Sequence, residues 1–449
     1  MSGPQEGAGL RKRTISSGKW TAFSYGSEQA LGFASNLILT QLLVPEMFGL
    51  MVVVNSIVTG LQMFSDVGIG PSLIQNERED PAFYNTAWTM QVVRGVVLWG
   101  VACGLAWPLS LVKAEWAPIA WLLPVASLTC VLNGFRSTAY VTASRRLNLK
   151  LVARLRVFTA VVRIAVMVSL AYFVTRSVWA LVAGLLVGSS LTCILSHRMI
   201  PEIKNRFHFE RQAFGELVSY GKWLFLGTLL TFCAGQVDKF LLAGLESFGL
   251  LGLYFIATKL ADLGPSFSKQ LGHMVGFPAL SDLYRRDPER FRSRFMQMRL
   301  VLTLPIHAVL LLMILFGPIL VHLIYPAAYG ESGWIIQLIA FGSLAGMVTT
   351  PYGQAYMATG RSKYNMLSVL AQLVAMLAAT LVGYRLAGGT GLLMGISVCQ
   401  WLKYVAESVL AKRSGVWQPR FDAAMLIGGG LLAYAAVWGS QWLAWRFVL

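Results

Sequence analysis

Uninterrupted apolar stretches, each long enough to form a transmembrane helix, recur along the whole chain. A helix needs about 20 apolar residues to cross the hydrocarbon core of a bilayer. The stretches are continuous and do not alternate apolar with polar residues, so they do not fit the strands of a membrane β-barrel. Charged residues make up only 13% of the sequence, against about 25% in soluble domains. The sequence therefore predicts an all-α, polytopic integral membrane protein.

The apolar stretches predict thirteen helices and their order. They span residues 20–43, 49–75, 83–109, 118–141, 156–175, 178–197, 216–241, 250–279, 300–323, 333–358, 365–386, 391–411 and 422–445. Basic residues concentrate on every second connection, as the positive-inside rule requires of cytoplasmic loops. Arg78, Arg154 and Arg299 are among the residues assigned to these loops. The N-terminus is therefore expected on the cytoplasmic side.

The net charge of +17 comes from 37 lysines and arginines against 20 aspartates and glutamates. In a soluble protein this excess would favour nucleic acid as a partner. Here the membrane topology accounts for it, so we expect contacts with membrane lipids and no nucleic acid. Residues 1–19 are basic and lack a cleavage pattern, which predicts a retained cytoplasmic tail.

Two segments about 200 residues apart read alike. Residues 45–50 (Pro-Glu-Met-Phe-Gly-Leu) match residues 245–250 (Leu-Glu-Ser-Phe-Gly-Leu), and each is followed by an apolar helix and an Asp-x-Gly pattern, at Asp66 and Asp262. A repeat of this length in a membrane protein indicates two related helix bundles. We expect two pseudo-symmetric six-helix lobes at 20–197 and 216–411, a cytoplasmic linker at 198–215 and one extra helix within 412–449.

Glycine and proline occupy matching places in the two repeats: Gly70 and Pro71 in the second helix, Gly264 and Pro265 in the eighth. Proline removes a backbone hydrogen bond and bends a helix. Membrane helices tolerate such bends where neighbouring helices or a water-filled cavity satisfy the freed backbone groups. We expect both helices to break there, beside the space between the lobes.

Several charged residues fall inside the predicted helices, where each costs about 2.5–3.5 kcal/mol on insertion scales. Such charges persist when they face a cavity or a partner. The cations Arg94, Arg136, Arg163 and Lys259 are candidates to line a cavity between the lobes. Because guanidinium and ammonium groups in a low dielectric attract phosphate above all, this cavity is expected to bind a diphosphate.

Three carboxylates, Glu28, Asp66 and Asp262, are candidates for ion coupling. An acidic group in a transport cavity can bind a coupling cation or carry a proton. A structural role competes with this assignment at one position, because Lys259 lies three residues before Asp262 and is able to neutralise it along one helix face.

The sequence shows no nucleophile motif, no metal-ligand spacing and no phosphate-binding Gly-Lys loop. Its five cysteines all fall in apolar segments, which is typical of small packing residues. We therefore expect a transporter and not an enzyme, with no catalytic residues, no metal and no cofactor. Active transport would then draw on an ion gradient, the membrane potential or the substrate gradient.

A family signature lies in the first repeat. Residues 39–50 and 64–75, which end in Asp-x-Gly-x-Gly-x-x-x-Ile-Gln, resemble the N-terminal signature of bacterial polysaccharide exporters, and residues 356–361 resemble them as well. These exporters are the Wzx-type oligosaccharide flippases and their lipopolysaccharide and colanic-acid relatives. They belong to the multidrug/oligosaccharidyl-lipid/polysaccharide exporter superfamily.

The resemblance implies a MATE-like pair of six-helix bundles that works by alternating access. It implies transport of a polyprenyl-diphosphate-linked oligosaccharide from the cytoplasmic to the periplasmic leaflet of the bacterial inner membrane, for surface polysaccharide biosynthesis. The partners it implies are this lipid-linked oligosaccharide, membrane lipids and a polysaccharide polymerase or other assembly proteins, with the exporter a monomer. Relatives have twelve or fourteen helices, so thirteen is a departure.

Three other functions compete with this one. A drug/cation antiporter of the same fold has a smaller cavity dominated by acidic groups, which the cationic interior disfavours. A peptidoglycan-precursor flippase shares the fold and mechanism and differs mainly in cargo. A membrane glycosyltransferase or polysaccharide polymerase needs a sizeable extracytoplasmic loop with catalytic groups, and the predicted outer loops are short.

Overall fold

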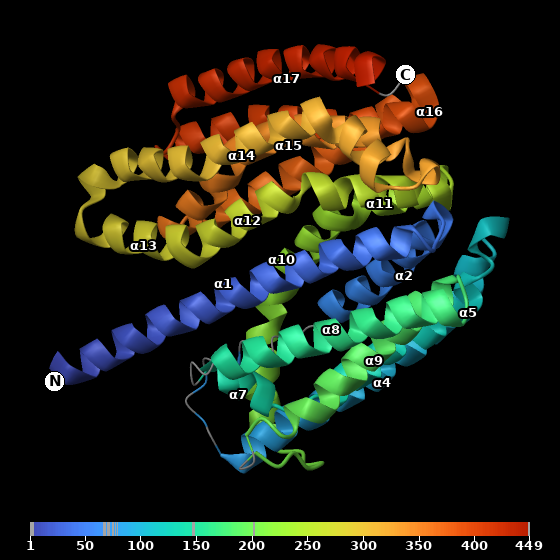
Figure 1. The fold of residues 1–449 in the computed structure, drawn as a ribbon. Helices are drawn as coiled ribbons and strands as arrows, with labels where there is room; N and C mark the ends of the chain where they lie inside the picture. The colour runs from blue at the N-terminus through green and yellow to red at the C-terminus, as the bar shows by residue number, and fades with distance from the viewer. Residues whose placement is uncertain are drawn as a thin grey trace. The chain divides into compact units, whose positions relative to one another are not determined.

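The computed structural model describes residues 4–65, 69, 72–73, 76, 78, 80–145, 149–200 and 203–447. It describes the backbone alone for residues 4–19, 21–22, 144–145, 219–226 and 444–447. Helices make up most of this part of the chain, which contains no strand (Figure 1). Nine helical segments of the described chain are long and apolar enough to cross a membrane. The prediction of an all-α polytopic membrane protein is confirmed.

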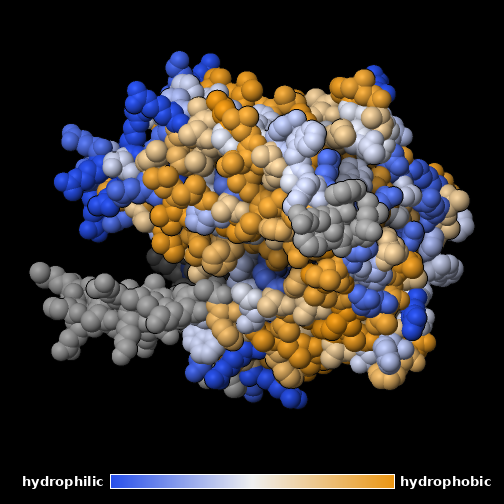
Figure 2. Space-filling model, turned by 45° about the horizontal axis from the view of Figure 1, so that its top comes forward, coloured by the Kyte–Doolittle hydropathy of each residue, from blue (hydrophilic) through white to orange (hydrophobic). Residues whose placement is uncertain are grey.

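The surface has the character expected of such a protein. Figure 2 shows broad hydrophobic areas on the visible face, with hydrophilic side chains gathered toward its margins. Large apolar side chains are mostly exposed on many helices, for example Trp121, Phe173 and Leu386. Because water-soluble monomers rarely expose apolar surface on this scale, these side chains face lipid.

The chain divides into two compact units, Met1–Leu43 with Leu50–Leu229, and Val44–Gly49 with Leu230–Leu449. The first unit contains α1 (Pro4–Thr40), most of α2 (Pro45–Phe64), α4 (Pro81–Ser110), the 3-10 helix η1 (Ala114–Trp116), α5 (Ile119–Ala126), α6 (Leu128–Phe135), α7 (Ala139–Arg145), α8 (Leu149–Phe173), α9 (Val178–Ser196) and the first part of α10 (Arg211–Leu245). Within it α1 packs on α8, α8 on α9 and α4 on α6.

Helices α4 and α6 cross at a reciprocal pair of glycines. A Cβ atom on Gly95 would lie 2.6 Å from the carbonyl oxygen of Cys130. A Cβ atom on Gly134 would lie 2.6 Å from the carbonyl oxygen of Gln91. Neither position has room for a side chain, so the two glycines bring the backbones of α4 and α6 into direct contact.

Residues 203–210 form an extended strap along the start of α4. Alternate backbone amides of the strap donate hydrogen bonds of 2.9, 3.0 and 3.0 Å to side chains of α4. The donor and acceptor pairs are Arg206 with Asn85, His208 with Thr89, and Glu210 with Thr86. The strap is therefore fastened to the first unit along its length.

Arg78 fastens the end of this strap. Its guanidinium lies 2.8 Å from Asp80, 2.9 Å from Glu210 and 3.5 Å from Glu216. The Arg78 hydrogen bond lowers the pKa of Asp80 below its ordinary value. The pKa of Glu216 is also lowered, chiefly because the Asn76 side chain donates a 2.9 Å hydrogen bond to it. Arg78 was assigned to a cytoplasmic loop from the charge pattern, and the structure adds that it joins three carboxylates.

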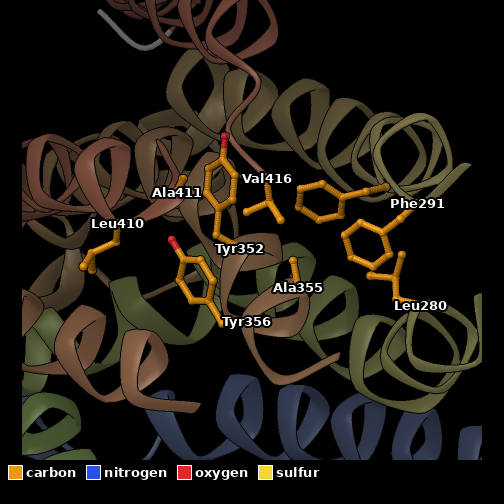
Figure 3. Packing of buried hydrophobic residues seen from close by; sticks show 9 residues of the cluster. Leu280, Phe291, Tyr352, Ala355, Tyr356, Leu410, Ala411 and Val416 are labelled. Atoms are coloured by element: carbon orange, nitrogen blue, oxygen red, sulfur yellow. The ribbon is translucent and has the colours of Figure 1, made fainter. Parts of the chain in front are cut away.

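The second unit contains the rest of α10, α11 (Phe248–Ala261), α12 (Leu263–Leu271), the π-helix η2 (Gly272–Gly276), α13 (Phe277–Arg286), α14 (Pro288–Ile324), the 3-10 helix η3 (Ala327–Tyr329), α15 (Ser332–Ala358), α16 (Ser362–Arg413) and α17 (Pro419–Phe447). Helix α15 is its centre, because α11, α14, α16 and α17 all pack on it. Figure 3 shows part of this core, where Tyr352 and Tyr356 of α15 lie among apolar side chains such as Phe291, Leu410 and Val416.

Residues 44–49 of the first repeat pack inside the second unit. A Cβ atom on Gly49 would lie 1.9 Å from the carbonyl oxygen of Phe248, and one on Gly252 would lie 1.9 Å from that of Pro45. The two segments that read alike in the sequence therefore meet through backbone atoms, which only glycine permits at these two positions.

Helix α16 is two helices joined by a tight reversal. Ala387 and Gly388 leave the helical conformation, and Gly388 has φ 58° and ψ −139°, a conformation that favours glycine. On either side of this turn, a Cβ atom on Gly383 would lie 2.1 Å from the carbonyl oxygen of Gly391. The two halves thus run back along each other, which confirms the prediction of two separate helices here.

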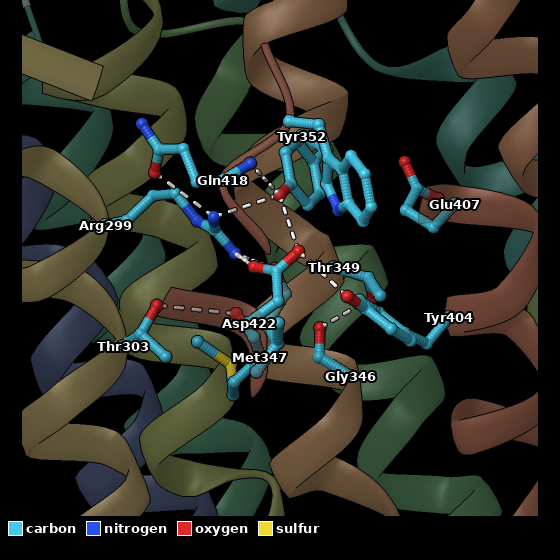
Figure 4. A network of polar contacts seen from close by, with 12 residues as sticks. Arg299, Thr303, Gly346, Met347, Thr349, Tyr352, Tyr404, Glu407, Gln418 and Asp422 are labelled. Carbon is cyan, nitrogen blue, oxygen red and sulfur yellow. Dashed lines mark hydrogen bonds and ion pairs between the residues drawn. The ribbon is translucent and has the colours of Figure 1, made fainter. Parts of the chain in front are cut away.

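A buried ion pair fastens α17 to the second unit. Arg299, predicted to lie in a cytoplasmic loop, is inside α14, and its side chain and that of Asp422 are 0% exposed with 2.5 Å between Nη2 and Oδ1. Arg299 also donates to Tyr352 and Gln418, at 3.0 and 3.2 Å. Asp422 accepts from Tyr352 and Tyr404, at 2.7 and 3.1 Å (Figure 4). The network connects α14, α15, α16 and α17.

Candidate functional site

A polar cavity of about 360 Å³ lies between α2, α4 and α6 in the first unit. Two of the predicted cations, Arg94 and Arg136, line it and are half-buried. The other lining residues are Thr59, Gln62, Met63, Gln91, Gly95, Leu98, Cys130, Asn133 and Gly134. The glycine crossing of α4 and α6 forms part of its wall, so the close approach of these helices shapes the cavity.

Arg94 is positioned by the end of α2. Its Nε atom donates to the Ser65 hydroxyl at 2.8 Å, and its Nη2 atom donates to the Gln62 carbonyl oxygen. The last carbonyl groups of a helix lack partners within the helix and carry partial negative charge. Both acceptors are uncharged, and these two bonds orient the guanidinium at the cavity wall.

A second cavity, of about 280 Å³, adjoins the first, because Asn133 and Arg136 line both. It lies between α1, α6, α7, α8 and α9. Its remaining lining residues are Glu28, Tyr140, Leu155, Arg156, Thr159, Ala160, Arg163, Leu185, Gly188, Ser189 and Thr192. The structure thus brings Arg94, Arg136 and Arg163 to one pair of adjoining cavities.

Tyr140 holds two of the guanidinium groups of the second cavity. The guanidinium carbon of Arg136 lies 4.5 Å from the centre of the Tyr140 ring, within the range of a cation–π contact. The Tyr140 hydroxyl accepts a 2.9 Å hydrogen bond from Nε of Arg156. One aromatic side chain therefore orients two cations, with its face and with its hydroxyl group.

Arg156 is a lining residue that the sequence reasoning missed. It lies seven residues before Arg163, which is two helical turns, so both side chains lie on one face of α8. The same spacing in the sequence was a usable signal. The neighbouring helix α9 leaves room for Arg163 at Gly188, where a Cβ atom would lie 3.1 Å from the Arg163 side chain.

Glu28 of α1 is the carboxylate of the second cavity, the one acidic side chain among the described residues that line it. Three arginines, Arg136, Arg156 and Arg163, line the same space. The formal charge of this described lining is therefore three positive charges against one negative charge. Such a lining attracts anions and also places an ionisable group beside them.

Lys259 and Asp262 lie in the second unit. The Lys259 ammonium, on an exposed side chain, lies 5.4 Å from the centre of the Phe255 ring. Asp262 separates α11 from α12 and forms a 3.9 Å ion pair with Lys269. Their predicted roles in diphosphate binding and ion coupling stay predictions.

Of the two expected helix breaks, only the one at Gly264 and Pro265 lies within the described residues. Gly264 and Pro265 lie in the first turn of α12, directly after α11 ends at Ala261. Proline at 265 has no N–H to donate to the carbonyl group of Ala261, so the chain has no continuous helical hydrogen bonding here. Asp66, Gly70 and Pro71 lie outside the described residues.

Within the part of the chain that the structure describes, no group of three or more His, Cys, Asp or Glu side chains is arranged to hold a metal ion. Among the described residues that line the two cavities, the polar side chains carry guanidinium, hydroxyl and amide groups, one thiol and one carboxylate. This set of groups suits an anionic ligand and not a metal ion.

Comparison with known proteins identifies the family. The family model described as "Polysaccharide biosynthesis protein" matches residues 38–333, more than half of the chain. The chain belongs to this family. The resemblance to Wzx-type polysaccharide exporters is confirmed.

Two relatives extend over most of the chain. The lipopolysaccharide biosynthesis protein WzxC of Escherichia coli (strain K12) is 23% identical over 398 residues, which cover 87% of this chain and 79% of that protein. An uncharacterized membrane protein in the cps region of Klebsiella pneumoniae is 21% identical over 400 residues, which cover 87% of this chain and 80% of that protein.

Solved structures establish the fold. The lipid II flippase MurJ in its inward closed conformation matches with a TM-score of 0.74 and 12% identity, over 94% of this chain and 92% of that one. An inward-facing multidrug resistance MATE family transporter of the MOP superfamily matches with a TM-score of 0.66 and 12% identity, over 86% and 95% of the two chains. The chain therefore has the fold of these transporters, as predicted.

Proposed function

We propose that this chain is a flippase that moves a polyprenyl-diphosphate-linked oligosaccharide across the bacterial inner membrane, for surface polysaccharide biosynthesis. Its polysaccharide biosynthesis family, its WzxC relative and its transporter fold support this function. The N-terminus lies in the cytoplasm, and the protein acts as a monomeric transporter without enzymatic activity. A polysaccharide polymerase takes up the oligosaccharide on the periplasmic side.

The observation that carries the proposal is the pair of adjoining cavities that share Arg136. A diphosphate diester carries two negative charges, and the planar guanidinium group binds phosphate oxygens through two parallel hydrogen bonds. We assign the diphosphate to Arg136, with Arg94 on the side of the first cavity and Arg163 on the side of the second. These groups replace the water that the diphosphate loses when it leaves the membrane surface.

Glu28 supplies a way to release the cargo. Its ionised carboxylate competes with the diphosphate for the guanidinium groups of the second cavity, whereas its protonated form leaves them to the diphosphate. The proton is then taken up with the cargo in the cytoplasm, lost in the periplasm and carried outward, so the inward proton gradient does not drive this step. The diphosphate and the proton together carry a net negative charge, which the membrane potential drives outward. Asp66 and Asp262 stay secondary candidates for this role.

Flipping by the purified full-length protein in lipid vesicles tests the function. The probe is a fluorescent polyprenyl-diphosphate oligosaccharide, and a membrane-impermeant quencher reports which leaflet it occupies. We expect the wild type to move the probe and R136Q to slow the initial rate at least about tenfold, since a hydrogen bond to a charged group is worth roughly 1.5–3 kcal/mol. R154Q, which removes an exposed cation of α8 outside both cavity linings, is the matched control.

The outcomes separate the function from the site. A wild type that moves no lipid-linked glycan overturns the flippase proposal, and preferred transport of a peptidoglycan precursor or of a cationic drug replaces it with one of the competing functions. Wild-type rates from both R94Q and R163Q overturn the assignment of these residues while the function stands. Normal membrane yield of each variant shows that insertion is intact.

A further inference from the structure

The second cavity has a mixed lining that a phosphate group alone does not need. Phosphate oxygens accept hydrogen bonds and require only donors from the protein. The described lining also presents acceptors, which are the Glu28 carboxylate and the hydroxyl groups of Thr159 and Thr192. Both hydroxyl groups donate to carbonyl oxygens of their own helices, at 2.9 and 2.8 Å. Because their protons are already donated, these hydroxyl groups can only accept hydrogen bonds from a ligand.

Acceptors of this kind fit sugar hydroxyl groups, which donate as well as accept. Asn133 and Ser189 add further neutral hydrogen-bonding groups to the same wall. The volume of about 280 Å³ is at the lower limit of ligand pockets, which range over roughly 300–1,000 Å³. It suits a single sugar ring and not a whole oligosaccharide.

The guanidinium groups of this cavity indicate that the sugar is charged. Once Arg94, Arg136 and Arg163 are assigned to the diphosphate, Arg156 remains beside Glu28 in the described lining. Over both described linings, four guanidinium groups face the Glu28 carboxylate and the two charges of the diphosphate, so one positive charge is left for the sugar. Arg156 is held in place by the Tyr140 hydroxyl, a neutral acceptor, at 2.9 Å. A fixed guanidinium in a partly enclosed cavity favours a carboxylate, with which it forms paired hydrogen bonds.

We propose that the second cavity binds a carboxylate-bearing sugar, a hexuronic acid or another acidic sugar, close to the diphosphate of the lipid-linked cargo. The proposal rests on the proposed flippase function and adds the chemical class of the glycan. Arg156 binds the sugar carboxylate, and Glu28, Thr159 and Thr192 accept hydrogen bonds from the ring hydroxyl groups. The cavity thereby selects acidic over neutral glycans.

Two matched probes test this selectivity in vesicles that contain the full-length protein. Both are polyprenyl-diphosphate disaccharides, and they differ only in one sugar, glucuronic acid in the first and glucose in the second. We expect the wild type to move the acidic probe about tenfold faster than the neutral probe at subsaturating concentration, because an additional hydrogen bond between charged groups contributes roughly that factor. R156Q should bring the ratio of the two rates close to one.

Two further variants separate the charge of Arg156 from its packing. R156K keeps the charge and should retain more of the preference than R156Q, whereas R154Q, on the same helix but outside the lining, should leave the ratio unchanged. Equal rates for both probes in the wild type, or an unchanged ratio in R156Q, would overturn the acidic-sugar proposal and leave the flippase function standing. Movement of neither probe by the wild type would overturn both.

Discussion

Two arginines of this protein, Arg136 and Arg299, show how surroundings decide the role of a charge inside a membrane protein. Arg299 is fully buried, and its two terminal nitrogens donate to Asp422 and to neutral acceptors around it. Arg136 is half-buried, lines two cavities and rests on the ring of Tyr140. The first arginine fastens helices together, and the second is the one that we propose binds the diphosphate.

The Arg299–Asp422 pair leads to a stability prediction. D422N leaves the Arg299 guanidinium buried without its counter-charge, and breaking a buried pair on one side costs about 3–5 kcal/mol. We expect a correspondingly large loss of thermal stability in detergent. R299M with D422L, which removes both charges, should lose less than D422N alone, because neither partner is left charged in the core. Thermal unfolding of the purified variants measures both effects.

A surface pair provides the matched control. Arg286 and Asp282 lie 2.9 Å apart, with side chains 78% and 55% exposed. Exposed pairs of this kind contribute about 0–1 kcal/mol, so D282N should leave the unfolding temperature almost unchanged. Equal losses in D422N and D282N would contradict the structural role assigned to the buried pair.

At the scale of helices, the crossing of α4 and α6 sets the shape of the first cavity. Gly95 and Gly134 line that cavity and also carry the backbone contact between the two helices. Widening the crossing therefore moves the wall on which Arg94 and Asn133 are placed. The same two glycines therefore determine both the contact between the helices and the shape of the cavity.

The substitution G134A tests this coupling. Its Cβ atom would meet the Gln91 carbonyl oxygen at 2.6 Å, and overpacking of this kind costs about 1–3 kcal/mol. We expect lower thermal stability together with slower flipping. G100A on α4, where nothing lies within 4 Å of a Cβ atom, should be neutral or slightly stabilising, because alanine favours the helix by up to about 1 kcal/mol. Unchanged stability in G134A would show that the crossing relaxes without cost.

The sequence was most informative about helices. The length and apolarity of the stretches were enough to locate the helices, because a helix that crosses the hydrocarbon core must be both long and apolar. The joint at Gly388 was predictable as a gap between two apolar stretches, although its backbone conformation was not. Arg156 was overlooked because a cation near the start of a helix also fits the positive-inside pattern of cytoplasmic loops. Only the seven-residue spacing to Arg163, read together with the neighbouring helices, places both in one cavity.

At the scale of the whole molecule, long-range pairing is what the sequence did not predict. Arg299 and Asp422 are 123 residues apart, and Arg78 and Glu210 are 132 apart. Both arginines fit the charge pattern of cytoplasmic loops, and that pattern does not distinguish a solvated arginine from a paired one. Distant contacts are fixed by tertiary packing, which hydropathy does not encode.

The Arg78 cluster leads to a prediction about pH. Asp80 has a pKa lowered by the Arg78 hydrogen bond, so it contributes stability that is fully present above its unfolded-state pKa of about 4 and is lost as the pH falls through the folded value. R78Q removes this shift. The stability difference between wild type and R78Q should therefore be largest near neutral pH and should shrink below about pH 4.

Thermal unfolding of the two proteins between neutral and acidic pH measures this difference. In a D80N background, R78Q should show a weaker dependence on pH, because the main titrating partner is absent. A difference that stays constant across the whole range would mean that Arg78 acts through packing alone and that the Asp80 carboxylate plays no part.

The six residues from Val44 to Gly49 bear on where the chain can be divided. They belong to the first repeat by sequence and to the second unit by packing, with glycine contacts at Gly49 and Gly252 that admit no side chain. Cleavage of the chain within residues 203–210 would give an N-terminal fragment that carries residues 44–49 of the second unit. The C-terminal fragment would lack these six residues. The boundary between the two repeats in the sequence is therefore not the boundary between the two compact units.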